Sequence, residues 1–431
     1  MPHGTKLENC GNMKTNTPPS SPDPHLYGDR EEVIDIGDIE EVIELDDDTN
    51  LEEVAERLVG AGGGEEDESM EDGEAADVTD MAAVVFSKHK GSVFSCSVSS
   101  SGNLAATGGE DDLAYVWDAN TGNVVFTCTG HKDSVTWVDF SQDGSLLATG
   151  DMSGFIQVWK ISTSSKIWEF EIGDLSWLTW HHASHVLLVG TADGEMWMWL
   201  IPQGNARTFP SYGVASQCGA LLPDGKRSVA GYEDGSVRVF DLKTGQLVQH
   251  FKDGQANTAS IASIAVHKDN TLILAGSFNG TAKLYNANSG KLVGTLNCEI
   301  TPNSEEDNEA DHTVEAVSFC PLTPNIAATA TLAGYVTFWD ISSQVSRHVI
   351  AQGCGSSRLV WHPSEPILFS AGLNGAIHSY DAQSGEPLAK YTGHKDSILA
   401  LSVTKDGSAL VTASDDGTAR VFKFFSSQQM N

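Results

Sequence analysis

The stretch Gly190–Leu200 reads GTADGEMWMWL, and seven related stretches recur along the chain. Each of them has an aromatic residue next to its end, and this residue is often followed by Asp. The aromatic residues are Trp117, Trp159, Trp199, Phe240, Tyr285, Trp339, Tyr380 and Phe422. The steps between them are 42, 40, 41, 45, 54, 41 and 42 residues. Eight copies at a period of about 40–45 residues predict the blades of a β-propeller.

Two features of the repeat have a structural explanation. Gly lies five residues before the aromatic residue in seven copies, and Asp112 takes its place in the first copy. Gly at this position permits the positive φ of a tight turn between strands. The residues after it are β-branched or aromatic, as an inner strand requires. Each copy therefore predicts a tight turn followed by a strand.

The repeat resembles that of the WD40 family, whose opening Gly-His pair appears here at residues 130–131 and 393–394. The resemblance implies a structural tetrad of His, Thr, Asp and Trp, joined by hydrogen bonds inside one blade. Carried over to this chain, its members are His89, Thr107, Asp111 and Trp117; His131, Thr149 and Trp159; and His394, Thr412 and Asp416. Ser153 stands where the second set needs Asp, and Phe422 lacks the indole donor of the third.

The propeller is predicted to close on itself. Residues 83–86 precede Lys88-His89 as residues 124–126 precede Gly130-His131, so they indicate an outer fourth strand with no blade before it. The last repeat lacks such a strand after Phe422. We expect residues 83–86 to complete the eighth blade, which leaves no unpaired junction. The predicted fold is an all-β, eight-bladed propeller over residues 81–425, followed by a short tail at 426–431.

Residues 1–80 are predicted to form an acidic, mostly disordered N-terminal region, because they hold 25 acidic and 4 basic residues. Residues 31–48 mix carboxylates with aliphatic side chains, which is typical of disordered binding segments. A capping box at residues 49–52 predicts a short helix over residues 50–59. Two alternatives stay open: this segment docks on the propeller or a partner, or it is only a solvating tail.

The formal net charge of −34 bears on the partners of the protein. Such a charge repels nucleic acid and anionic membranes, and it attracts basic polypeptides. The 7 cysteines are scattered without a C-x-x-C pair, which indicates reduced thiols in the cytoplasm. No apolar run is long enough to span a membrane. We expect a cytoplasmic monomer that binds no nucleic acid directly, with the periphery of the cell membrane as a second location.

The resemblance also implies where partners bind. In the family, the Asp-Gly turns and the loops between blades share one face, where partners commonly bind. In this chain that face collects acidic residues, and an insert in the longest step adds more. The predicted partner-binding residues are Glu110, Asp112, Asp151, Asp193, Glu195, Glu233, Asp234, Glu305, Glu306, Asp307, Asp415 and Asp416. The alternative is that the turn carboxylates are structural and the insert is a solvated loop.

Motifs for catalysis or metal binding are missing from the sequence. His181, His182 and His185 have no Cys or carboxylate at ligand spacing, which favours a turn at a strand end. H-E-x-x-H, G-x-S-x-G and G-x-G-x-x-G do not occur. An enzyme in the propeller channel is the remaining alternative, but no nucleophile–base pair is visible. We therefore expect no enzymatic activity, no cofactor and no metal.

The first four repeats narrow the resemblance. The runs GGEDD (108–112), GHKDSV (130–135) and GTADG (190–194) are similar to those of the angio-associated migratory cell protein family. That family includes the dedicated yeast chaperone of a large-subunit ribosomal protein. Its animal members are linked to cell migration and angiogenesis, with Rho-pathway signalling. The resemblance thus implies a non-enzymatic scaffold or chaperone in ribosome assembly, whose acidic face binds a basic polypeptide. A signalling adaptor at the cytoplasm and cell periphery is the alternative.

Overall fold

The computed structural model describes residues 79–252, 259–299 and 312–424. The chain divides into two units, residues 1–73 and 74–431, and every described residue belongs to the second. Several predictions lie outside the described residues: the disordered region up to residue 78, the helix over residues 50–59 and the tail after residue 424. The predicted contact residues Glu305, Glu306 and Asp307 also lie outside them.

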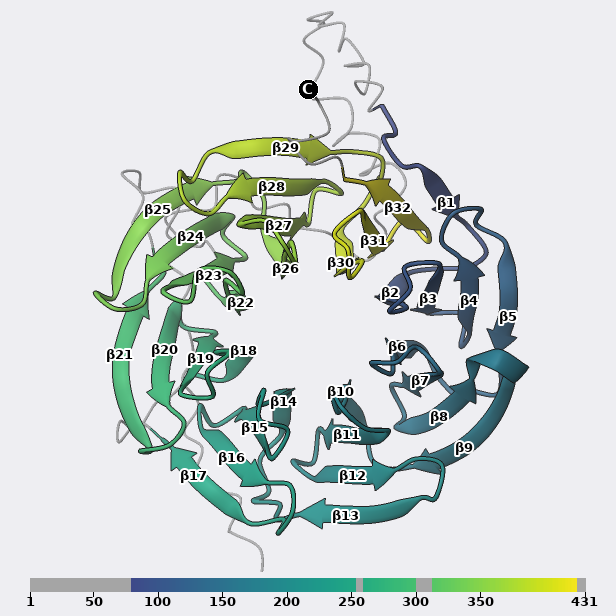
Figure 1. Cartoon of the computed structure of the whole chain (residues 1–431), viewed down its shortest axis with the longest axis horizontal. Coiled ribbons are helices and arrows are strands. Elements are labelled where there is room, and N and C mark those ends of the chain that lie inside the picture. The colour runs from purple at the N-terminus through teal and green to yellow at the C-terminus, as the bar shows by residue number, and fades with distance from the viewer. Residues whose placement is uncertain (1–78, 253–258, 300–311, 425–431) are drawn as a thin grey trace, which may run out of the picture. The chain divides into compact units, whose positions relative to one another are not determined.

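Eight four-stranded antiparallel sheets form a closed ring, which confirms the predicted all-β, eight-bladed propeller (Figure 1). Blade 1 contains β2 (Val93–Val98), β3 (Leu104–Gly109), β4 (Ala114–Asp118) and β5 (Val124–Cys128). Blade 2 contains β6 (Val135–Phe140), β7 (Leu146–Asp151), β8 (Phe155–Lys160) and β9 (Ser165–Glu171). Blade 3 contains β10 (Leu175–Trp180), β11 (Val186–Thr191), β12 (Met196–Leu200) and β13 (Asn205–Phe209). Blade 4 contains β14 (Ser216–Leu221), β15 (Arg227–Tyr232), β16 (Val237–Asp241) and β17 (Leu247–Phe251).

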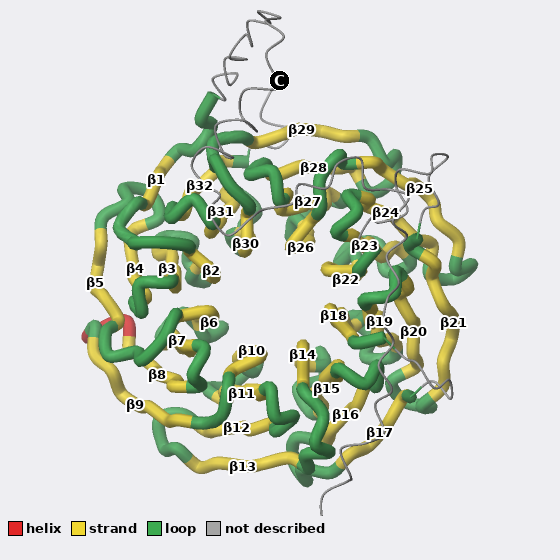
Figure 2. Tube along the Cα trace, turned by 180° about the vertical axis from the view of Figure 1, so that it is seen from behind, coloured by secondary structure: helices red, strands yellow, loops and turns green. Residues whose placement is uncertain are grey.

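The second half of the ring has the same architecture. Blade 5 contains β18 (Ile261–Val266), β19 (Leu272–Ser277), β20 (Thr281–Asn286) and β21 (Lys291–Asn297). Blade 6 contains β22 (Val314–Phe319), β23 (Ile326–Thr331), β24 (Tyr335–Asp340) and β25 (Val345–Ala351). Blade 7 contains β26 (Ser356–Trp361), β27 (Ile367–Gly372), β28 (Ile377–Asp381) and β29 (Pro387–Tyr391). Blade 8 contains β30 (Ile398–Val403), β31 (Ala409–Ser414), β32 (Ala419–Lys423) and β1 (Val84–Phe86). The short 3₁₀ turn η2 (Ile161–Thr163) is red in Figure 2.

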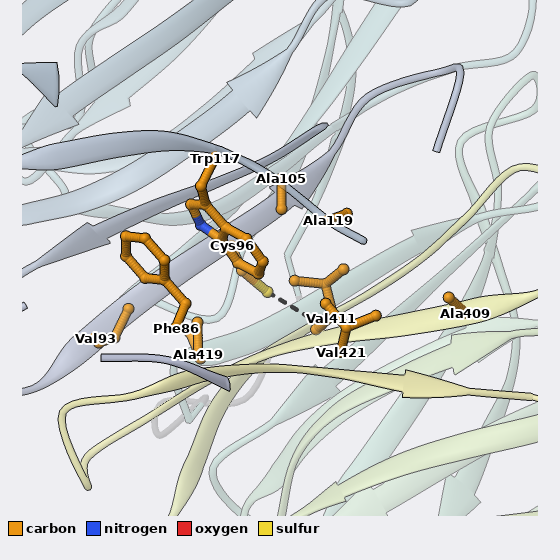
Figure 3. Close-up of a cluster of buried hydrophobic side chains, with 11 residues drawn as sticks. Phe86, Val93, Cys96, Ala105, Trp117, Ala119, Ala409, Val411, Ala419 and Val421 are labelled. Carbon is orange, nitrogen blue, oxygen red and sulfur yellow. Dashed lines mark hydrogen bonds between the residues drawn. The ribbon is translucent and has the colours of Figure 1, made fainter. Parts of the chain in front are cut away.

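The ring closes through β1, as the sequence predicts. β1 pairs antiparallel with β32, and Phe86 lies opposite Ala419. The ring of Phe86 stacks on Trp117 of blade 1, with centroids 4.8 Å apart (Figure 3). In the same cluster the Cys96 thiol donates to the carbonyl of Val411 in blade 8, at 3.3 Å. The N-terminal strand therefore completes the last blade and also packs against the first.

The turn after each second strand has left-handed backbone at the position where the repeat places Gly. Gly194 has φ +76° there, and Asp112 has φ +59° in the one copy without Gly. Asp tolerates this conformation better than most residues because its short side chain can bond the local backbone. The repeated turn is thus the same in blade 1 as elsewhere, despite the change of residue.

The hydrophobic core lies between neighbouring blades. Trp177 of blade 3 is a good example, since its side chain is 2% exposed and packs against blade 4. Its indole N–H donates to Ser216 Oγ at 2.7 Å. A Cβ atom at Gly190 or Gly219 would overlap the indole ring, so both glycines make room for it. Such contacts fix each blade against the next and hold the loops that connect them.

Candidate functional site

One backbone hydrogen bond recurs in all eight blades and defines one face of the ring. In blade 1 the amide of Glu110, which follows the second strand, donates to the carbonyl of Ser92, which precedes the first strand. The equivalent donors are the amides of Met152, Ala192, Glu233, Phe278, Leu332, Leu373 and Asp415, with lengths of 2.9 to 3.1 Å. These eight residues hold one equivalent position. We call the face that carries them the loop face.

Six of the predicted contact residues have exposed positions at the loop face. They are Glu110, Asp112, Asp193, Glu195, Glu233 and Asp415. Asp193, Glu233 and Asp234 line a hollow of about 520 Å³ between blades 3 and 4. Like charges on one face add to one another's field, and the range of that field is set by the ionic strength.

Asp151 does not belong to this exposed set, although its place in the sequence predicts a contact residue. Its side chain is fully buried, 3.1 Å from His131 Nδ1 through Oδ2. The same Oδ2 accepts a hydrogen bond from the amide of Lys132 at 2.9 Å. Oδ1 accepts from Ser153 Oγ at 2.7 Å and from the amide of Phe155 at 2.9 Å. Asp151 thus fills, from two residues earlier, the place of the turn Asp that Ser153 cannot fill.

The bonds of Asp151 should make stability depend on its charge. Burial acts to raise the pKa of Asp151, but the hydrogen bonds from His131, Lys132 and Ser153 outweigh it and lower the pKa to about 2. The carboxylate therefore contributes stability that is complete above its unfolded pKa of about 3.9 and is lost as the pH falls through about 2.

We expect Asp151→Asn to lower the free energy of unfolding by about 2–3 kcal/mol at pH 7, because an amide group would face two backbone or side-chain donors. Urea unfolding at pH 7 and at decreasing pH measures this. The difference from wild type should stay constant above about pH 4 and shrink below it. Asp193→Asn, at an exposed turn, is the matched control and should change stability by less than about 0.5 kcal/mol. Equal losses in the two variants would contradict the structural role.

The first predicted tetrad is present in blade 1. His89 Nδ1 lies 2.8 Å from Asp111 Oδ1, and His89 Nε2 lies 2.9 Å from Thr107 Oγ1. The Trp117 indole N–H donates to the same Thr107 oxygen at 3.3 Å. Burial lowers the pKa of His89, and the Asp111 carboxylate opposes that effect. These four side chains hold the loop face to the strands beneath it.

The other two sets form only in part. His131 Nε2 lies 2.8 Å from Thr149 Oγ1, but the Trp159 indole nitrogen has no hydrogen-bond partner in the described part of the chain. In blade 8, His394 lies 2.9 Å from Asp416 and 2.7 Å from Thr412. The side chain of Asp416 is only 6% exposed, so this predicted contact residue serves the interior of the blade.

Blade 4 contains a buried cluster in place of the tetrad, and the repeat pattern does not predict this cluster. The guanidinium of Arg238, which is 3% exposed, lies over the rings of Tyr212 and Tyr232, at 4.4 and 4.0 Å from their centroids. Asp234 lies 3.6 Å from this guanidinium and 2.9 Å from the ammonium group of Lys252. The carboxylate of Asp234 is thus already paired, and it should contribute less to partner binding than Glu233 beside it.

The described ranges contain no group of three or more His, Cys, Asp or Glu residues that could hold a metal ion. The histidines of residues 181–185 form other contacts: His181 Nε2 lies 3.0 Å from the carbonyl of Gly225, and His185 Nε2 lies 3.0 Å from Asp143 Oδ2. Among the same described residues, no helix is long and apolar enough to cross a membrane.

Comparison with known proteins agrees with these repeats. The family model of the WD domain, G-beta repeat, matches residues 82–118, 122–160, 245–286 and 385–423. Human angio-associated migratory cell protein is 39% identical over 348 residues, which cover 80% of this chain and 80% of that protein. The chain belongs to this family of WD40-repeat proteins. Ribosome assembly protein SQT1 of Saccharomyces cerevisiae is 26% identical, and the alignment covers 83% of this chain and 91% of SQT1.

Solved structures of the yeast protein and of a fungal counterpart have the same fold. The crystal structure of Saccharomyces cerevisiae Sqt1 aligns with a TM-score of 0.72 at 22% identity, over 81% of this chain and 100% of that chain. Chaetomium thermophilum Sqt1, bound to the N-terminus of the ribosomal protein L10, aligns with a TM-score of 0.71 at 21% identity. That alignment covers 80% of this chain and 100% of the fungal chain.

Proposed function

We propose that this protein is a non-enzymatic WD40 chaperone whose loop face binds a basic protein segment during ribosome assembly. The observation that carries the proposal is the set of exposed carboxylates on one face, among them Glu110, Asp193, Glu233 and Asp415. Few cations oppose them there, and one of these, Lys132, is already paired with Glu171 at 2.6 Å. Such a surface attracts a polycation and repels an RNA backbone.

The relatives indicate the class of partner. SQT1 is named a ribosome assembly protein, and the Chaetomium thermophilum protein is seen bound to the N-terminus of ribosomal protein L10. Ribosomal proteins carry basic segments because they contact RNA phosphates. A segment of this kind, before it reaches RNA, would exchange its counterions for the carboxylates of the loop face. We therefore propose the N-terminal segment of ribosomal protein L10 as the partner.

The cysteines support a cytoplasmic setting for this activity. Cys96, Cys128, Cys298 and Cys320 are free and buried, and burial raises the pKa of the Cys96 thiol to about 12. Protonated, enclosed thiols of this kind form no disulfides and suit a reducing compartment. We propose that the protein meets its partner there, before the ribosomal protein is assembled.

Binding of the full chain to a fluorescein-labelled N-terminal peptide of L10 tests the proposal. Anisotropy titrations over a series of salt concentrations should show affinity that falls steeply as salt rises, because charges on the loop face are screened within about 8 Å at physiological ionic strength. A scrambled peptide of equal charge measures the contribution of sequence. Absence of binding at low salt, or affinity that does not change with salt, would contradict the proposal.

A second candidate function rests on the identity of 39% to angio-associated migratory cell protein, whose name refers to cell migration and angiogenesis. By this proposal the protein is a signalling adaptor, linked to the Rho pathway and acting in the cytoplasm and at the cell periphery. Affinity purification from cytosol at low and high salt separates the two functions. Capture of signalling proteins that resists high salt, without L10, would favour the adaptor over the chaperone.

A further inference from the structure

Of the eight equivalent positions of the loop face, Glu110, Glu233 and Asp415 are acidic, and the other five are apolar. Met152 and Ala192 stand between Glu110 and Glu233. Asp415 and Glu110 follow one another around the ring, in blades 8 and 1. Phe278, Leu332 and Leu373 hold the same position in the three adjacent blades 5, 6 and 7. We call these three residues the apolar arc. It leads directly into the acidic pair, because blade 7 lies next to blade 8 (Figure 1).

Local contacts bind the apolar arc into one surface. The Thr313 hydroxyl donates to the carbonyl of Phe278 at 3.4 Å, and the Thr313 carbonyl accepts from the amide of Leu332 at 3.1 Å. Gly355 lies between the other two residues, and a Cβ atom there would be 2.6 Å from the Leu332 carbonyl oxygen and 2.8 Å from Leu373 Cδ1. The glycine thus leaves space in which the Leu373 side chain comes close to the backbone of Leu332.

The same kind of contact joins the arc to the acidic pair. The carbonyl of Leu373 accepts from the Ser397 hydroxyl at 2.9 Å, and the Ser397 carbonyl accepts from the amide of Asp415 at 3.0 Å. Two hydrogen bonds of Ser397 therefore connect Leu373 of the apolar arc with Asp415 of the acidic pair. An extended segment that lies over Asp415 would also reach Leu373.

Phe278 is the most exposed residue of the apolar arc. Its side chain is 51% exposed, and it lines a cavity of about 550 Å³ together with residues of the inner strands, such as Ile264 and Leu359. Exposed apolar surface beside a cavity is the place where a partner's apolar side chain gains most from leaving water.

We propose that the apolar arc seats an aromatic or aliphatic side chain of the same basic segment whose charged residues lie over Asp415 and Glu110. The inference rests on the proposed function and specifies its partner further: the segment carries an apolar residue beside its basic ones. The carboxylates draw the segment to the face, and the apolar arc fixes its register, because it is the one run of three consecutive apolar residues among the eight equivalent positions.

The experiment compares Phe278→Ser with Leu292→Ser in the full chain. Leu292 is 50% exposed and lies on β21, the outer strand of the same blade, so it controls for loss of exposed apolar surface. The probes are the L10 N-terminal peptide and a version in which Ser replaces every aromatic and aliphatic residue. Phe278→Ser should weaken binding of the natural peptide about ten-fold, while Leu292→Ser leaves it unchanged. The loss should persist at high salt because apolar contacts are not screened.

Two further results decide the outcome. The Ser-substituted peptide should bind wild type about ten-fold more weakly, and Phe278→Ser should weaken that peptide little further, since the two changes remove one contact. If Phe278→Ser and wild type bind both peptides equally, the apolar arc is no anchor, although the proposed function stands. If wild type binds neither peptide, the proposed function fails and the inference fails with it.

Discussion

Phe86→Ala should lower the free energy of unfolding by about 3–5 kcal/mol, the range for an aromatic side chain removed from a packed core. Phe86 is 1% exposed and stacks on Trp117, which is itself fully buried in blade 1. It stands on the three-residue strand β1, which is hydrogen-bonded to blade 8. The substitution therefore removes packing at the place where the two ends of the propeller meet. A ring that opens there exposes unpaired strand edges.

Urea unfolding, followed by tryptophan fluorescence, measures this loss. Val85→Ala is the matched control, because Val85 is the preceding residue on the same strand and is 44% exposed. It should cost less than about 1 kcal/mol. Limited proteolysis should also show faster cleavage of the Phe86→Ala variant before residue 90, since the strand would detach more often. Equal stability of the two variants would mean that the closure does not depend on this side chain.

The closure could be predicted from sequence because it depends on counting. Residues 83–86 precede a repeat in the way that residues 124–126 do, and the last repeat lacks a fourth strand. A chain with one strand too many at its start and one too few at its end has a single economical solution. The period and the turn position were equally visible, since a left-handed turn accepts Gly and, in blade 1, Asp112.

The candidate site was less predictable, because a carboxylate looks the same in sequence whether it is exposed or bonded. Asp151 and Asp193 both lie in or beside the repeated turn, yet Asp151 is buried against His131 and Asp193 is exposed. Asp151 takes the role of the turn Asp because Ser153 stands at that position. The Ser153 hydroxyl donates a hydrogen bond to Asp151. The apolar arc did leave a signal: each residue of the equivalent position stands seven residues before the terminal aromatic residue of its repeat. A comparison of this position between the eight repeats distinguishes Phe278 from the acidic residues.

The inner strands carry another feature without a sequence signal. The first two strands of every blade shift register at the same point, for example between Val135 and Trp137 in blade 2 and between Ser356 and Arg358 in blade 7. A bulge of this kind breaks the alternation of side chains and changes which residue points into the centre of the ring. A strict alternation of side chains along the inner strands therefore predicts the wrong residues in the central channel for the part of each strand that follows the bulge.

Charge reversal on the loop face should have the largest effect on binding. We expect Glu233→Lys combined with Asp415→Lys to weaken the L10 peptide about 30- to 100-fold at low salt. Two carboxylates become ammonium groups, which changes the charge by four units, and each unit is worth about 0.5–0.7 kcal/mol to a cation held near it at the surface. Within the described residues neither side chain forms a hydrogen bond or ion pair, so the change should leave stability intact. The effect should fall to a few-fold at high salt, where exposed charges no longer interact beyond the screening length.

The matched control reverses Glu365 and Glu386, which lie in blade 7 between β26 and β27 and between β28 and β29, at the opposite face of the ring. It changes the net charge by the same amount, so it separates the field of the whole protein from the field of one face. If net charge alone attracts the peptide, the two double variants will lose affinity equally and retain equal salt dependence. If the loop face binds it, the control will stay within about three-fold of wild type while the Glu233 and Asp415 variant loses most of its affinity. The second result, together with unchanged unfolding curves for both variants, is the outcome that the distribution of exposed carboxylates leads us to expect.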